Sequence, residues 1–190
     1  MRVLVVDESP ERVVVLRDGL ERAGYEVAAA LAGSIELLRA VEQVRPDVII
    51  IDTDSPSRDV LEHVVMISRD EPRPIVMFST DDAPETIRDA VRAGVSAYVV
   101  DGLDAARVKS IVEVAVARFD EYQRLRAELA DANLKLSERK QVERAKGILM
   151  KTRGVGEDDA YQMLRRMAMD RGKRVGEIAQ QLIDMADLLI

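Results

Sequence analysis

Residues 48–52 read Val-Ile-Ile-Ile-Asp, a run of four β-branched residues that ends in an acid. A strand that is apolar on both faces is typical of the interior of a parallel sheet, where helices cover both sides. Further short β-rich runs flank this one in the sequence: Arg2–Val6, Tyr25–Ala29, Ile75–Phe78 and Ala97–Val100. The N-terminal half of the chain is therefore predicted to form a five-stranded parallel sheet.

Segments with helical spacing of apolar residues separate these runs: Pro10–Ala23, Ser34–Val44, Ser57–Arg69 and Ala83–Ala93. Strands that alternate with helices imply right-handed crossovers and helices on both faces of the sheet. We expect an α/β domain of the doubly wound, flavodoxin-like type. Its functional site should lie at the carboxyl ends of the strands.

The sequence after Gly102 has a different pattern. From Leu103 to Lys151 it contains no Pro, and its first Gly in this range is Gly147. A long helix is the simplest interpretation, either continuous or broken once near Ser137. Within it a heptad seam has spacings of 3, 4, 3 and 4: Tyr122, Leu125, Leu129, Ala132 and Leu136. Such a seam pairs two chains as a coiled coil or packs against its own N-terminal domain, and we favour self-association.

Two more helices follow, after breaks at Gly154–Gly156 and at Arg171-Gly172. The predicted organisation is an α/β domain (1–117), a coiled-coil linker helix (118–137) and an all-α domain of three helices (138–190). The predicted core of the last domain is Val142, Ala145, Leu149, Ala160, Leu164, Ala168, Ile178 and Leu182.

The composition excludes several classes of site. The chain has no Cys, which rules out disulfides and thiolate metal sites, and its single His, His63, argues against a histidine-based catalytic dyad. No apolar run approaches the roughly 18 residues of a membrane span, and no signal peptide is evident. We expect a cytoplasmic protein that is not an enzyme.

The net charge of -7 is unevenly distributed. Glu138–Arg174 carries 11 Lys and Arg against 6 Asp and Glu, whereas the remaining residues carry 17 basic and 29 acidic side chains. This asymmetry indicates that the C-terminal segment meets a polyanion. The alternative is a solvated helical face that binds nothing.

Acidic residues follow two of the predicted strands: Asp7 and Glu8 follow the first, and Asp52 follows the third. Adjacent parallel strands would bring the three carboxylates to one rim, where Mg²⁺ would be a suitable counter-ion. The alternative is that Asp7 serves only as a helix N-cap. No cofactor is required by either interpretation.

The sequence around these acids resembles the response-regulator receiver family. The resemblance lies in Val5–Glu8, Ile51–Pro56, Phe78–Thr80 and Gly94–Tyr98. It implies that Asp7, Glu8 and Asp52 bind Mg²⁺ and that Asp52 is the phosphoacceptor. It also implies that Ser79 and Tyr98 respond to phosphorylation.

One position departs from the receiver pattern. The family places a Lys after the fifth strand, usually followed by Pro, and this chain has Asp101 and Gly102 there. That Lys contacts the phosphoryl oxygens, so an Asp would add repulsion beside a dianionic group. We expect that phosphorylation does not switch this protein.

Residues 138–150 read Glu-Arg-Lys-Gln-Val-Glu-Arg-Ala-Lys-Gly-Ile-Leu-Met, with cations on two faces of one helix. With Ala160–Ala168 and Ile178-Ala179, this segment resembles the ANTAR domain. That resemblance implies RNA binding and transcription antitermination at leader stem-loops. The residues expected to contact RNA are Arg139, Lys146, Lys151, Arg165 and Arg166.

A receiver, a coiled-coil linker and an ANTAR domain together resemble the AmiR and NasT regulators, with NasT-like regulators the closer match. The resemblance implies control of nitrate and nitrite assimilation genes, an active homodimer, and sequestration by a nitrate sensor of the NasS type. The main alternative is a phosphorylation-controlled response regulator that binds DNA. An adaptor that binds only protein is a further alternative.

Overall fold

A computed structural model describes residues 1–100 and 107–188. The chain divides into two compact units, Met1–Gln123 and Arg124–Ile190, and the division falls within the predicted linker 118–137. Asp101 lies outside the described residues. The two units are described separately below.

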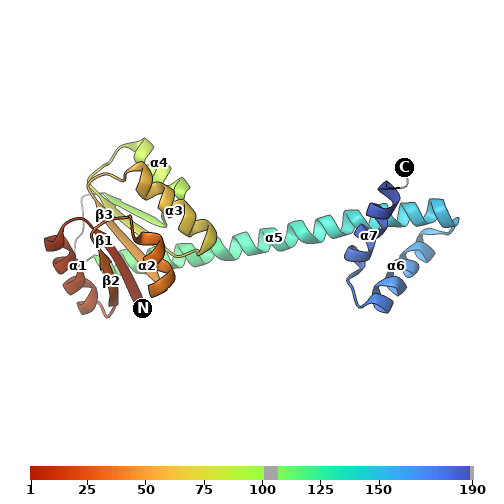
Figure 1. Ribbon diagram of the computed structural model, residues 1–190, viewed down its shortest axis with the longest axis horizontal. Coiled ribbons are helices and arrows are strands. Elements are labelled where there is room, and N and C mark those ends of the chain that lie inside the picture. Colours follow the sequence, from red (N-terminus) through yellow and green to blue (C-terminus); the bar gives the residue numbers. More distant parts are fainter. Residues whose placement is uncertain (101–106, 189–190) are drawn as a thin grey trace. The chain divides into compact units, whose positions relative to one another are not determined.

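The first unit contains a parallel sheet in the order β2-β1-β3-β4-β5 (Figure 1). Its strands are β1 (Arg2–Asp7), β2 (Glu26–Leu31), β3 (Val48–Thr53), β4 (Ile75–Ser79) and β5 (Ala97–Val100). All four neighbouring pairs are parallel, which confirms the predicted doubly wound sheet. The strands β1 and β3 extend far enough to include Asp7 and Asp52 in the sheet itself.

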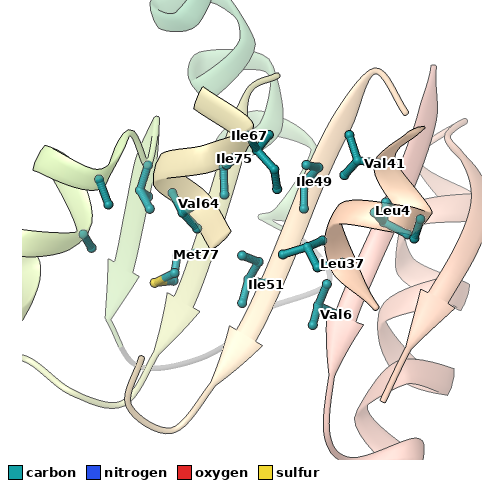
Figure 2. Packing of buried hydrophobic residues seen from close by; sticks show 14 residues of the cluster. Leu4, Val6, Leu37, Val41, Ile49, Ile51, Val64, Ile67, Ile75 and Met77 are labelled. Carbon is teal, nitrogen blue, oxygen red and sulfur yellow. The ribbon is translucent and has the colours of Figure 1, made fainter. Parts of the chain in front are cut away.

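Helices cover both faces of this sheet. One face packs against α2 (Leu37–Val44), α3 (Arg58–Asp70) and α4 (Pro84–Ala93), and Figure 2 shows side chains of this layer. The other face packs against α1 (Pro10–Arg22) and the first turns of α5 (Val108–Arg153).

The strand β3 shows why this sequence needs two layers of helices. Ile49 and Ile51 belong to the first layer, Val48 and Ile50 belong to the second, and all four are at most 2% exposed. Full burial of one such side chain contributes about 1.5–3 kcal/mol. The apolar run at 48–51 therefore stabilises both cores of the receiver-like unit.

The start of α1 is set by its local sequence. Ser9 is the N-cap, and its hydroxyl accepts a hydrogen bond from the backbone N–H of Arg12 at 3.4 Å. Pro10 occupies the first turn, where a missing N–H costs nothing. These residues place Arg12 in the first turn of the helix, directly after the carboxyl end of β1.

The second unit consists of the later part of α5 with α6 (Glu157–Arg171) and α7 (Val175–Asp187). Its core contains all eight predicted residues, with Val142 only partly buried. The helix α5 runs without a break through Ser137, so the continuous alternative is the one observed. Gly172, with φ of +60°, ends α6 in the left-handed conformation that glycine adopts without strain.

Gly94 joins α4 to β5 at a φ of +116°, and a Cβ there would overlap Ser68 Oγ and lie 2.7 Å from Ser68 Cβ. Gly24 has a φ of +88° with open space around it.

We predict that Gly24→Ala costs about 1 kcal/mol of unfolding free energy from backbone strain alone. Gly94→Ala should cost clearly more, because it adds a steric overlap with α3. Urea unfolding of both variants tests this, and equal losses would contradict it.

Candidate functional site

Two carboxylates meet at the carboxyl edge of the sheet. Asp7 and Asp52 are register partners on the neighbouring strands β1 and β3, and they are 1% and 8% exposed. Glu8 is exposed. The structure thus brings together two of the three acids that the sequence predicts at this rim.

A cation that the sequence analysis did not single out lies against these acids. The Arg12 guanidinium donates to Asp7 from Nε at 3.2 Å and from Nη2 at 3.0 Å. Its Nε lies 3.7 Å from Asp52 Oδ2, and its Nη1 lies 3.2 Å from Asp54 Oδ1. The sequence signal for this contact is an Arg five residues after a strand-end Asp, in the first turn of the next helix.

The pKa of Asp52 is raised above its ordinary value. Burial is the main cause, and the neighbouring charge of Asp7 raises it further. Arg12 acts in the opposite direction, and the charge of Asp54 adds to the increase. The ionised form of Asp52 is therefore less favourable in the folded protein than in water.

A hydrogen-bond network joins the loop after β3 to the loop after β4. The hydroxyls of Ser79 and Thr80 both donate to the backbone carbonyl of Asp54, at 2.9 and 3.0 Å. The Tyr98 hydroxyl donates to the backbone carbonyl of Asp81 at 2.8 Å. The two residues predicted to act as a switch are thus both bound to backbone atoms of these loops.

Asp81 is a second residue that the sequence analysis missed. Its carboxylate accepts from the Ser55 hydroxyl at 2.7 Å, from the Ala83 N–H at 3.0 Å and from the Thr86 hydroxyl at 3.2 Å. These bonds lower the pKa of Asp81, with Ser55 as the largest cause. Asp81 lies three residues before the start of α4, and its residue type and position alone gave no signal for these contacts.

In the second unit the five predicted RNA-contacting cations fall into two groups. Arg139 and Lys151 on α5, and Arg165 and Arg166 on α6, are all exposed. Within residues 1–100 and 107–188, none of these four forms an ion pair. Their charges are free to meet an anionic partner.

Lys146 is different, since it is only 8% exposed. Its Nζ lies 2.6 Å from Glu157 Oε1 and 2.9 Å from Glu143 Oε1. The hydrogen bond that Lys146 donates to Glu157, followed by the one to Glu143, raises the pKa of Lys146. The contact with Lys146 also lowers the pKa of Glu157. The side chain therefore ties α5 to the first turn of α6.

A groove of about 380 Å³, which Arg139 helps to line, lies between α5, α6 and the start of α7. Its polar lining comprises Lys135, Glu138, Arg139, Glu143, Tyr161 and Arg174. The start of α7 approaches α5 closely here, so that a Cβ on Gly176 would lie only 3.0 Å from Glu138 Cγ. The Arg174 guanidinium donates to Glu138 across this contact at 3.4 Å.

The heptad seam of α5 is exposed along its length. Tyr122 and Leu129 are each 62% exposed, and Leu125 and Leu136 are 51% and 53% exposed. Ala132, the remaining member, is also exposed. A row of large apolar side chains in contact with water is typical of a protein interface.

Comparison with known proteins identifies both units. Residues 3–113 match the response regulator receiver domain family, and residues 130–183 match the ANTAR domain family. The transcriptional regulatory protein PdtaR of Mycobacterium tuberculosis is 33% identical over 186 residues, which cover 96% of this chain and 89% of that protein. This chain is an ANTAR-domain response regulator. It thus belongs to a regulatory family whose ANTAR domains bind RNA.

Other relatives match parts of this ANTAR-domain response regulator. The nitrate regulatory protein of Klebsiella oxytoca is 39% identical over 80 residues, which are 42% of this chain and 20% of that protein. The signal receiver domain of a modulated diguanylate cyclase from Desulfovibrio desulfuricans G20 has a TM-score of 0.56 at 23% identity. It covers 64% of this chain and 97% of its own, and it supports the receiver fold alone.

One earlier alternative loses support once the regulator is identified. The ANTAR match covers the C-terminal helices, so a DNA-binding output domain is not favoured. Among the described residues, no helix of the regulator is long and apolar enough to cross a membrane.

The raised pKa of Asp52 predicts how the stability of the receiver depends on pH. Below the unfolded-state pKa, Asp52 is protonated in both states, so Asp52→Asn should change little. As the pH rises through the folded-state pKa, ionisation of the buried carboxyl costs free energy that Asn avoids. Asp52→Asn should therefore stabilise the receiver at neutral pH, with an advantage that shrinks in acid. Urea unfolding across this pH range checks it, and a less stable Asn variant at neutral pH would show that Arg12 outweighs burial.

Proposed function

We infer that this regulator binds stem-loops in leader transcripts through its ANTAR domain and so prevents premature termination of transcription. The observation that carries the proposal is the set of four exposed, unpaired cations on α5 and α6 within a family whose ANTAR domains bind RNA. Lys and Arg side chains hold the phosphate backbone, while exposed loop bases carry the sequence information.

The four cations have distinct positions in this proposal. Arg139 lines the groove beside Tyr161 and Arg174, so it is placed to contact a base or its phosphate. Lys151, Arg165 and Arg166 would hold the backbone on either side. Lys146 would act as a positioning residue, because its ammonium group already binds Glu143 and Glu157.

We further propose that two chains act together. The exposed seam from Tyr122 to Leu136 would pair two copies of α5 within the linker 118–137, and each copy would present one ANTAR domain (138–190) to one of two stem-loops. Two linked RNA contacts raise the overall affinity without any new interaction, provided both loops can be reached at once.

The regulatory input that we propose is a protein and not a phosphoryl group. The similarity to the nitrate regulatory protein of Klebsiella oxytoca supports nitrate and nitrite assimilation genes as targets. A nitrate sensor of the NasS type would hold the regulator inactive in the cytoplasm until nitrate binds the sensor. This step can be tested by sedimentation of the purified regulator and sensor. The two proteins should sediment as a complex without nitrate and separately with nitrate.

The RNA site is tested with the full chain and a library of paired stem-loops with randomised loops. After selection, fluorescence anisotropy should show that Arg165→Ala with Arg166→Ala weakens binding at least about tenfold. The slope of log affinity against log salt should also fall by about 1 for each lost phosphate contact. Arg92→Ala, which removes an exposed charge from α4 of the receiver, is the control and should have no effect.

Two results would refute this proposal. The first is a double variant that binds the selected RNA as tightly as the unaltered chain. The second is duplex DNA of equal length that competes as well as the selected stem-loops.

The pairing of α5 helices has its own test. Leu129→Glu places a charge in the middle of the seam and should shift the protein towards monomer by at least about tenfold in dissociation constant. Ala127→Glu adds the same charge two residues away, on the face opposite the seam, and should leave association unchanged. Analytical ultracentrifugation with and without RNA measures both, and an equal effect of the two variants would argue against the seam.

A further inference from the structure

The carboxylates at the edge of the receiver sheet are the acids that the receiver family uses for a divalent metal ion. Asp7 and Asp52 supply oxygen ligands of the kind that Mg²⁺ prefers. Whether this chain suits such an ion depends on what already occupies those oxygen atoms.

The side chain of Arg12 occupies them. It donates to both Asp7 oxygens, with Nε 3.2 Å from each and Nη2 3.0 Å from Oδ1. Asp7 Oδ1 also accepts the Ser9 backbone N–H at 2.7 Å. A metal ion would have to displace the guanidinium, or bind directly beside its positive charge.

The position of Arg12 follows from the backbone of α1. Ser9 caps the helix and Pro10 begins its first turn, so Arg12 lies one turn from the end of β1. The cation is therefore covalently tethered next to Asp7, and its local concentration does not depend on the concentration of ions in solution. A divalent ion from solution pays the entropic cost of association, and the tethered guanidinium does not.

The arrangement of the remaining acids agrees with an organic cation. Arg12 Nη1 extends to Asp54 at 3.2 Å, so one planar guanidinium spans carboxylates from β1 and the loop after β3. A guanidinium is suited to such a span, because its donors lie in a fixed fork. Among the described residues, no group of three or more acidic or histidine side chains is arranged to ligate a metal ion.

We propose that Arg12 is a built-in cation that replaces the divalent metal ion of the receiver. It pairs with Asp7, lies beside Asp52 and connects the start of α1 to the loop after β3. The receiver then holds its β3 and β4 loops in one arrangement without metal. Phosphoryl transfer to Asp52, which depends on a metal ion to balance the developing charge, has no ion to use.

Metal affinity of the full-length protein tests this proposal directly, with Mn²⁺ as the probe and free Mn²⁺ followed by electron paramagnetic resonance. The unaltered chain should bind Mn²⁺ no more tightly than Asp7→Asn. Arg12→Ala should bind it at least about tenfold more tightly than the unaltered chain, and Mg²⁺ should then raise its melting temperature. Arg22→Ala is the matched control, because it removes a cation of the same helix that pairs with Asp18 at the surface.

Two outcomes would overturn the proposal. One is Mn²⁺ binding by the unaltered chain at least tenfold tighter than by Asp7→Asn, since the metal would then coexist with Arg12. The other is an Arg12→Ala protein, folded by circular dichroism, that gains no affinity. Where Arg12→Ala does not fold, Arg12→Gln replaces it, and the first comparison decides in any case. None of these measurements involves RNA, so they are independent of the proposed function.

Discussion

Two carboxylates at the ends of neighbouring strands need a cation beside them. Asp7 and Asp52 end up side by side because β1 and β3 pair in register, and both are buried by the same packing that stabilises the sheet. Unbalanced charges in such a place would oppose folding of the first unit. Arg12 supplies one positive charge from within the chain, and its contacts join α1, β1 and the loop after β3 at this edge.

In the second unit the buried charge is positive and its partners are acidic. Lys146 lies near the core of the three helices, and Glu143 and Glu157 surround its ammonium group. Arg139 and Lys151 on α5 and Arg165 and Arg166 on α6 remain exposed, and none of them forms an ion pair within the part of the chain that the structure describes. Burial and pairing separate a structural cation from the four proposed RNA-binding cations within a segment whose sequence shows only that it is basic.

Much of the architecture was predictable from periodicity. The apolar run at 48–51 and the alternation of strands and helices predicted the observed sheet. The absence of Gly and Pro from Leu103 to Lys146 predicted a long helix, and the structure decided that this helix is continuous. The core of the ANTAR domain was predicted as well, since apolar spacing on a helix identifies its buried face. The site was predicted less completely: Asp7 and Asp52 meet as expected, whereas Glu8 is exposed and Asp101 lies outside the described residues.

Residue type and spacing along the chain were enough to establish the receiver sheet, the three ANTAR helices and the basic character of the C-terminal segment. These properties depend on local periodicity, which any stretch of sequence displays. Folding in three dimensions was needed to show that Arg12 pairs with the acids, that Asp81 receives three hydrogen bonds, and that Lys146 is paired. Charge pairing depends on distances between residues of different elements, and linear spacing does not encode those distances.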